Sequence, residues 1–210
     1  MVMRLKLALT KGRLEKKSAE LFERAGLDCS PLREDTRRLI HSLPNYPLDI
    51  VLAKSADVIT YVENGVCDLG IVGKDTILEQ GNSFYEVLDL GFGKCRFALC
   101  AKKGEDIFGK TRDLRIATKY PNVAKSFFDK KGLNTEIIKI DGSVELAPLL
   151  GLSDAIVDIV ETGTTLRENG LEPVEFFCNI SARLIINIAS MKMNKSLADD
   201  FVDRLRAKLV

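Results

Sequence analysis

Tryptophan is absent from this 210-residue sequence, histidine occurs once, and the five cysteines show no CxxC spacing. The lone His41 lies near the centre of an expected strand, where a structural role is favoured over a catalytic one. Ser-His-Asp and Cys-His catalysis therefore have little support, and zinc chemistry has less. The odd number of cysteines argues against a disulfide framework, so we expect reduced thiols in a cytoplasmic protein.

Long hydrophobic runs and an excess of one charge are also absent. No stretch approaches the roughly 18 unbroken apolar residues of a membrane span. The apolar residues 5–9 are interrupted by Lys6 and run into charged residues, which favours a first strand over a signal peptide. The formal net charge of +1 predicts no general attraction to nucleic acid or to a membrane, so any anion site must be local.

Short β-branched or leucine-rich runs instead alternate with helical patterns along the whole chain. This alternation predicts an α/β fold with largely parallel sheets. Ser55, Asp75 and Asn122 are expected to cap or open three of the helices. Expected strands are 5–9, 37–43, 48–53, 68–73, 95–101, 114–118, 136–140, 155–160, 174–180 and 183–190. The first helix is expected over 14–25, and a last one carries Leu197, Phe201, Leu205 and Leu209 on one face.

We interpret this pattern as two lobes with a cleft between them. The first lobe is expected to contain residues 1–90 and 178–210, and the second residues 91–177. A chain of 210 residues is long enough to bury two small cores.

The segment AIVDIVETGTTLRENG, residues 155–170, joins an apolar strand containing an acid to a threonine-rich loop and a helix. A helix cap alone would explain Thr162 or Thr164, but the same exposed N–H groups and hydroxyls suit a phosphate monoester. Gly163 lets the backbone approach the anion closely. Asp158 lies near the carboxyl end of its strand, where open α/β sheets place ligands, and ribose hydroxyls are suitable partners for it. Together with Thr165, these residues predict a site for a ribose 5-phosphate.

Cationic side chains follow several of the expected strands. Lys11 and Arg13 flank a glycine, without the GxxxxGK[ST] spacing of a P-loop. Arg37 and its neighbour Arg38 would point to opposite faces of a strand, so only one can face the cleft. Lys54 follows another strand. The segments GKD (Gly73–Asp75) and ATKYPN (residues 117–122) also end strands. A solvated basic surface explains each cation singly, but together they indicate an anion site in the cleft.

The segment ELAPLLGLSDAIVDIVETGTTL, residues 145–166, closely resembles the signature of the ATP phosphoribosyltransferase family. The matching positions are Glu145, Gly151, Ser153, Ile156, Asp158 and the TGxTL ending at Thr162, Gly163, Thr165 and Leu166. The segments LALTKGRL, DVITYVENGVCDLGIVGKD and RIATKYPNVAKSFF look like the same family. The resemblance spans essentially the whole chain, and its length is similar to the short form, which lacks a C-terminal regulatory domain.

The resemblance implies a two-lobed fold similar to type II periplasmic binding proteins, with the active site between the lobes. It implies transfer of the 5-phosphoribosyl group from 5-phosphoribosyl 1-pyrophosphate to N1 of ATP, the first step of histidine biosynthesis, with Mg²⁺. Short-form members depend on a regulatory subunit resembling histidyl-tRNA synthetase, within a hetero-octamer that contains homodimers of catalytic subunits.

The resemblance also implies roles for individual residues. Catalytic cations would be Lys11, Arg13, Arg37 and Lys54, and the ATP-binding residues Lys11, Arg13, Gly73 and Asp75. Phosphoribosyl pyrophosphate would contact Glu145, Asp158, Thr162, Gly163, Thr164 and Thr165, and no resident metal site is expected. One departure is Lys54-Ser55, where many members have arginine followed by proline or alanine. Lysine keeps the charge but loses the bidentate fork.

Three alternatives remain open at this level. A non-catalytic protein of the same fold would bind a small anion or a nucleotide. A phosphoribosyltransferase of the purine-salvage kind would place two adjacent acids after the strand, whereas two residues separate Asp158 from Glu161 here. A purely structural subunit would not need so many site residues.

Replacing Asp158 tests whether this carboxylate contacts the ribose. We predict that Asp158→Ala sharply reduces turnover while the protein stays folded, because the ribose would lose its carboxylate partner. Steady-state kinetics with circular dichroism of the same sample would check this. A variant with near-wild-type kcat/KM would refute the role assigned to Asp158.

Overall fold

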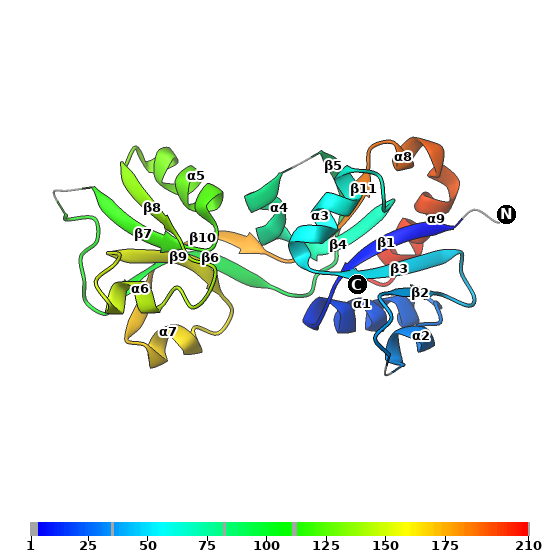
Figure 1. The fold of residues 1–210 in the computed structure, drawn as a ribbon, viewed down its shortest axis with the longest axis horizontal. Helices are drawn as coiled ribbons and strands as arrows, with labels where there is room; N and C mark the ends of the chain where they lie inside the picture. Colours follow the sequence, from blue (N-terminus) through cyan, green and yellow to red (C-terminus); the bar gives the residue numbers. More distant parts are fainter. Residues whose placement is uncertain (1–3, 35, 82, 111–112, 210) are drawn as a thin grey trace. The chain divides into compact units, whose positions relative to one another are not determined.

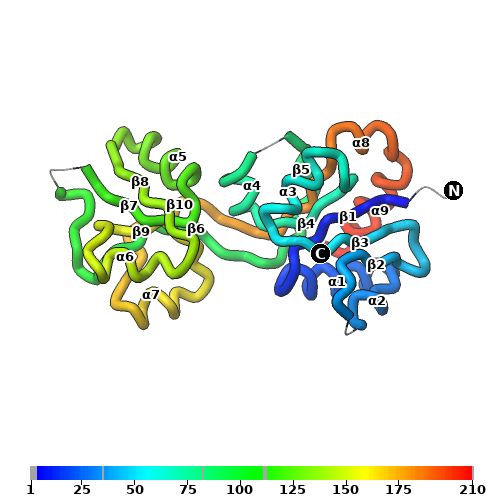
Figure 2. The backbone as a smooth tube through the Cα atoms, in the orientation of Figure 1, coloured from blue at the N-terminus to red at the C-terminus, as the bar shows by residue number. Residues whose placement is uncertain are grey.

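The chain forms two compact α/β units in a computed structural model that describes residues 4–34, 36–81, 83–110 and 113–209. The first unit contains Met1–Gly93 and Ser181–Val210, and the second contains Lys94–Ile180. The chain passes between the units twice, once after Gly93 and once after Ile180 (Figures 1 and 2).

A six-stranded sheet forms the centre of the first unit, in the order β2-β3-β1-β4-β11-β5. Its strands are β1 (Leu5–Thr10), β2 (Ile40–Ser42), β3 (Leu48–Ala53), β4 (Leu69–Gly73), β5 (Phe84–Asp89) and β11 (Ala182–Asn187). The central strands β1, β3 and β4 are parallel. β2 and β11 run antiparallel to their neighbours, and β5 pairs antiparallel with β11.

Helices cover both faces of this sheet because its central strands are apolar on both sides. Leu5, Leu7 and Leu9 of β1 pack with α1 (Arg13–Arg24) and α9 (Lys195–Arg206). The intervening Ala8 packs on the opposite face with α3 (Ser55–Glu63) and α4 (Lys74–Gln80). The short helices α2 (Ser30–Arg33) and α8 (Ser190–Met193) complete the unit.

The second unit has a five-stranded sheet in the order β10-β6-β9-β7-β8. The strands are β6 (Cys95–Lys102), β7 (Leu114–Thr118), β8 (Thr135–Lys139), β9 (Ala155–Val160) and β10 (Leu171–Ile180). β7, β8 and β9 are parallel, whereas β6 and β10 are antiparallel. α5 (Pro121–Lys131) packs on one face, and α6 (Leu146–Leu149) and α7 (Thr164–Glu168) pack on the other (Figure 1).

Several sequence predictions are confirmed at the level of elements. α1 forms where the first helix was expected, and α9 buries Phe201 and Leu205 of its expected apolar face. α3 buries Val58, Ile59 and Val62. α3 is followed by Gly65 with φ 67°, a left-handed conformation that favours glycine. His41 is buried and its Nε2 lies 3.1 Å from the carbonyl oxygen of Arg38, in keeping with a structural role.

Other predictions are corrected. The sheets are mixed rather than largely parallel, since β2, β6, β10 and β11 all pair antiparallel. β5 was not predicted. Ser55 and Asn122 lie inside α3 and α5, whose N-cap positions are Lys54 and Tyr120. Proline suits the first turn of a helix, and Pro121 opens α5 there.

The boundaries between the units also differ from the expected ones. Residues 91–93 belong to the first unit, and 178–180 belong to the second. β10 pairs with β6 from Leu171 to Ile180, so residues 178–180, which were expected in the first lobe, stay in the second. Its proline, Pro173, lies at a register shift on an edge strand, where no ladder donor is needed.

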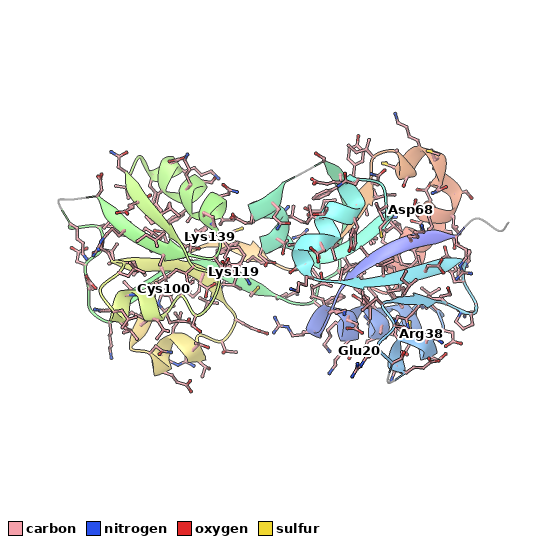
Figure 3. The ribbon with its side chains drawn as sticks, in the orientation of Figure 1. Glu20, Arg38, Asp68, Cys100, Lys119 and Lys139 are labelled. Atoms are coloured by element: carbon pink, nitrogen blue, oxygen red, sulfur yellow. The ribbon has the colours of Figure 1, made fainter. Side chains whose placement is uncertain are left out.

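Asp68 ties three parts of the first unit together just before β4 (Figure 3). Its carboxylate accepts hydrogen bonds from the backbone N–H of Lys6 at 2.8 Å, the hydroxyl of Ser190 at 2.7 Å and the amide of Asn194 at 2.8 Å. Its carbonyl oxygen accepts from the N–H of Asn187 at 2.8 Å. One side chain thus links β1 with α8 and the start of α9.

We predict that Asp68→Ala lowers the free energy of unfolding of the first unit by about 2 to 4 kcal/mol, because three donors lose their charged acceptor. Urea unfolding followed by circular dichroism would measure this. Asp141→Ala is the matched control, since the Asp141 side chain is 85% exposed, and it should change stability by less than about 0.5 kcal/mol. Equal stability of the two variants would contradict the prediction.

Candidate active site

The carboxyl ends of β7, β8 and β9 meet at one edge of the second sheet, because these strands are parallel neighbours. Loops that leave this edge carry Glu145 and the threonine-rich segment, and Asp158 lies two residues before the end of β9. The structure therefore brings together, within one unit, all six residues predicted to contact phosphoribosyl pyrophosphate. Those residues are Glu145, Asp158, Thr162, Gly163, Thr164 and Thr165.

The threonine-rich loop is held by its own polar groups. Gly163, with φ 71°, occupies the N-cap position of α7, so neither Thr162 nor Thr164 is the cap residue. The Thr162 hydroxyl lies 3.1 Å from that of Thr164 and accepts the backbone N–H of Thr164 at 3.4 Å. α7 has five residues, so its dipole is short and the local N–H and hydroxyl groups are the main donors available to an anion.

Arg167 braces this loop, a role that the sequence reasoning missed. Its guanidinium donates to the carbonyl oxygen of Thr162 at 3.0 Å and to the hydroxyl of Thr164 at 3.2 Å. The spacing of three residues between Thr164 and Arg167, typical of neighbours on one helix face, was the signal that would have identified it. A Cβ on Gly163 would lie 3.3 Å from the Arg167 guanidinium, so glycine also leaves room for this contact.

Asp158 is half-buried on the face of β9 that packs against α6 and α7. Burial raises the pKa of this carboxyl group to about 6, and the charge of Glu145 adds to the increase. A hydrogen bond from the backbone of Ile159 and the charge of Lys119 lower the pKa. A raised pKa in a carboxylate beside an anion-binding loop is a feature of ligand sites.

Cys100 of β6 lies on the same face of the sheet, fully buried. Burial, with the charges of Asp158 and Glu145, raises the pKa of its thiol to about 12. A thiol of this kind is un-ionised at neutral pH and is a poor nucleophile. Cys100 therefore packs the floor of the site without taking part in covalent chemistry.

In the first unit, β1, β3 and β4 end at a common edge. The N–H of Lys11 donates to the carbonyl oxygen of Ala53 at 3.0 Å, which places the turn after β1 next to Lys54. Gly12 adopts φ 90° in this turn and donates its N–H to Glu15 at 3.0 Å. Lys11, Arg13 and Lys54 are all exposed, so the first unit does bring these three predicted cations to one edge.

Gly73 and Asp75 lie at the end of β4 on the same edge. The Asp75 carboxylate folds back over Gly73, and a Cβ at residue 73 would collide with its Oδ1. Asp75 is also in the first turn of α4, where a carboxylate complements the helix dipole. Gly73 as the N-cap and Asp75 in the first turn of α4 are thus explained by the start of the helix, and their contact with ATP stays a prediction.

Arg37 lies in the chain that leads into β2 rather than in the strand itself, which begins at Ile40. The expected alternation between Arg37 and Arg38 therefore does not apply, and both are exposed. The N–H of Leu52 donates to the carbonyl oxygen of Leu39 at 2.8 Å, so this segment enters the sheet beside the carboxyl end of β3.

Two absences can be stated for the described ranges 4–34, 36–81, 83–110 and 113–209. Within them, no group of three or more His, Cys, Asp and Glu side chains is arranged to hold a metal ion. Over the same ranges, no helix has both the length and the apolar character needed to cross a bilayer.

Comparison with known proteins identifies the family. The family model for ATP phosphoribosyltransferase matches residues 54–207. ATP phosphoribosyltransferases from Clostridium kluyveri and Listeria monocytogenes are 55% and 54% identical, covering 98% and 96% of this chain and 94% of each relative. The chain belongs to the ATP phosphoribosyltransferase family.

A solved structure is similar throughout. The ATP phosphoribosyl transferase (HisG:HisZ) complex from Thermotoga maritima contains a chain that matches with a TM-score of 0.84 and 35% identity, covering 98% of both chains. This likeness confirms the two-lobed α/β class expected from the sequence. Family membership makes the protein a pentosyltransferase of the first step of histidine biosynthesis, and the length of its relatives matches the short form.

The raised pKa of Asp158 predicts a pH-dependent effect on stability. Between pH 3.8 and about 6 the native state binds more protons than the unfolded chain, so the carboxyl group makes the native state less stable as pH rises through this window. We predict that Asp158→Asn is about 1 to 3 kcal/mol more stable than wild type at pH 8, and that this gain shrinks towards pH 4.

Urea unfolding at several pH values would measure the difference. Asp141→Asn is the control, because this side chain is 85% exposed and its replacement should change stability little. A stability difference for Asp158→Asn that stayed constant from pH 4 to pH 8 would contradict the prediction.

Proposed function

We propose that the second unit binds the phosphoribosyl group through the loop 162–165, with Asp158 and Glu145 at the ribose hydroxyls. The observation that carries this assignment is the half-buried Asp158 carboxylate at the same strand end as a loop rich in hydroxyl and N–H groups. A phosphate monoester and a vicinal diol need these two kinds of group side by side.

We further propose that Lys11, Arg13, Arg37 and Lys54 bind the triphosphate of ATP or the leaving pyrophosphate, with Gly73 and Asp75 contributing to ATP binding. The exposure of the four cations, three of them on one edge of the first sheet, supports this role. Lys54 offers a point charge in place of the planar fork of an arginine, so it would bind phosphate with less directional preference.

The proposed chemistry is direct displacement. N1 of adenine attacks C1 of the ribose as pyrophosphate departs, so positive charge develops on the sugar and negative charge on the leaving group. The ionised Asp158 lies on the side of the sugar, and the cations act on the pyrophosphate. Catalysis is then mainly positioning and electrostatic stabilisation. The un-ionised Cys100 thiol agrees with a reaction that needs no covalent intermediate.

Mg²⁺ fits this arrangement as an ion that arrives on the substrate phosphates. Mg²⁺ is commonly held by one or two carboxylates together with phosphate oxygens rather than by a cage of protein ligands. When bound, the ion would neutralise charge on the pyrophosphate.

We propose that the chain works with a regulatory subunit resembling histidyl-tRNA synthetase. The support is its likeness to the catalytic component of the Thermotoga maritima complex over 98% of both chains. Homodimers of the catalytic chain within a hetero-octamer are the corresponding assembly. The proposed location is the cytoplasm, which suits the reduced thiols expected from an odd number of cysteines without CxxC spacing.

The activity assay follows the absorbance of N1-modified adenine in a mixture of protein, ATP, 5-phosphoribosyl 1-pyrophosphate and Mg²⁺, with and without the partner subunit. We predict that Lys54→Met lowers kcat/KM at least about tenfold, since a cation on a departing phosphate contributes more than about 1.4 kcal/mol. Lys17→Met is the control, because Lys17 is exposed on α1 and pairs with Glu20.

Product formation that chelation of Mg²⁺ abolishes is the expected result. Absence of product even with the partner present would instead favour a protein that binds nucleotide without chemistry. Equal kinetics of Lys54→Met and Lys17→Met would remove Lys54 from the site.

A further inference from the structure

The register of the second sheet places Lys119 next to Asp158. β7 pairs in parallel with β9, with Ala117 opposite Ile156 and Thr118 opposite Val157. When the same register is extended by one residue beyond Thr118 and Val157, Lys119 lies opposite Asp158. Side chains alternate between the faces of a sheet, so residues opposite one another point to the same side. Lys119 therefore leaves the sheet on the face that carries Asp158.

The packing of the neighbouring residues agrees with this placement. Ala117 and Ile156 belong to the core beneath α6 and α7, whereas Val157 belongs to the core beneath α5. Lys119 is two residues after Ala117 and so returns to the side of α6 and α7. Figure 3 shows Lys119 where β7 ends.

Buried hydrogen bonds fix the backbone on both sides of Lys119. The Thr118 hydroxyl, fully buried, donates to the carbonyl oxygen of Val157 at 2.7 Å and accepts the N–H of Tyr120 at 2.9 Å. The same threonine thus ties the end of β7 to the strand of Asp158 and sets the turn that follows. The Lys119 side chain is exposed at a backbone position that is well defined.

The charged and titratable groups around Asp158 come from three elements. Glu145 approaches from the start of α6, Cys100 from β6 and Lys119 from the end of β7. From α7, the apolar Leu166 packs on this face, and Arg167 is engaged with the Thr162–Thr164 loop. Of these groups, Lys119 is the cation whose charge acts on Asp158, and it opposes the effect of Glu145.

We propose that Lys119 is a positioning residue for phosphoribosyl transfer, which keeps Asp158 ionised beside Glu145 so that the carboxylate can accept hydrogen bonds from both ribose hydroxyls. This inference rests on the proposed role of Asp158 as a ribose ligand. A protonated carboxyl group has a donor in place of one acceptor, so it would hold the vicinal diol less well. The burial of Asp158 makes such assistance necessary near neutral pH.

The test compares Lys119→Gln with Lys139→Gln. Lys139 ends the adjacent strand β8 and stands opposite Thr118, so it leaves the sheet on the other face, and it lies 3.6 Å from Asp141. Both lysines are exposed, and neither substitution should impair folding. The measurement is kcat/KM for 5-phosphoribosyl 1-pyrophosphate from pH 5.5 to 8.5, with the partner subunit present.

We expect the acid limb of the Lys119→Gln profile to move up by about 0.5 to 1 pH unit, which is a loss of roughly three- to tenfold in kcat/KM on that limb. At pH 8.5 the loss should be small, since Asp158 is ionised in either protein. Lys119→Arg should restore the wild-type profile, and Lys139→Gln should not move it. An unshifted Lys119→Gln profile, or an equal shift in Lys139→Gln, would overturn the proposal.

A second measurement separates this inference from the ribose-binding role. Carboxyl ¹³C NMR of the free protein, with the Asp158 resonance assigned by Asp158→Asn, reports the ionisation of the group without turnover. The titration midpoint should rise in Lys119→Gln and stay in place in Lys139→Gln. An unchanged midpoint overturns the Lys119 proposal, whereas wild-type kcat/KM in Asp158→Asn overturns the ribose role instead.

Discussion

The burial of one carboxylate, Asp158, is the constraint around which the second unit is organised. Its strand is apolar on both faces, and the residues two before and two after it, Ile156 and Val160, are buried in the core beneath α6 and α7. An ionised group in this setting loses hydration, and Glu145 adds repulsion instead of compensation. A sequence selected only for stability would place an apolar residue here. A bound ligand that supplies the missing hydrogen-bond donors would offset the free-energy cost of burying Asp158.

Topology explains why the groups of each unit gather where they do. In both sheets the parallel strands end at one edge, and loops leaving that edge carry the polar residues. Because β6 and β11 are antiparallel to their neighbours, the chain segments that connect the two units also lie at these edges. Arg96, near the start of β6, is opposite Val160 at the end of β9, and Ala182, at the start of β11, is opposite Gly73 at the end of β4. Each unit therefore has its polar edge next to its connections to the other unit.

The sequence predicted the features that depend on local patterns. The apolar strand with its acid, the glycine at the turn and the inward faces of α1, α3 and α9 all follow from periodicity and residue type. Features that depend on pairing were not predicted. The end of β10, residues 178–180, was expected in the first lobe because its apolar residues do not reveal which strand it joins. Lys119 was noted only as the end of a strand, since its approach to Asp158 depends on the register between β7 and β9.

The second unit orders its predicted phosphoribosyl loop through its own contacts. Arg167 holds the loop from the helix side through Thr162 and Thr164, and Thr118 holds the strand end from the sheet side. Gly163 adopts the left-handed conformation needed in the turn between the strand end and α7. None of these contacts uses a residue of the first unit, whereas the proposed pyrophosphate cations all belong to it. In the proposed reaction, binding of the phosphoribosyl group and departure of pyrophosphate depend on residues of different units, so substitutions in the two sets should affect KM and kcat differently.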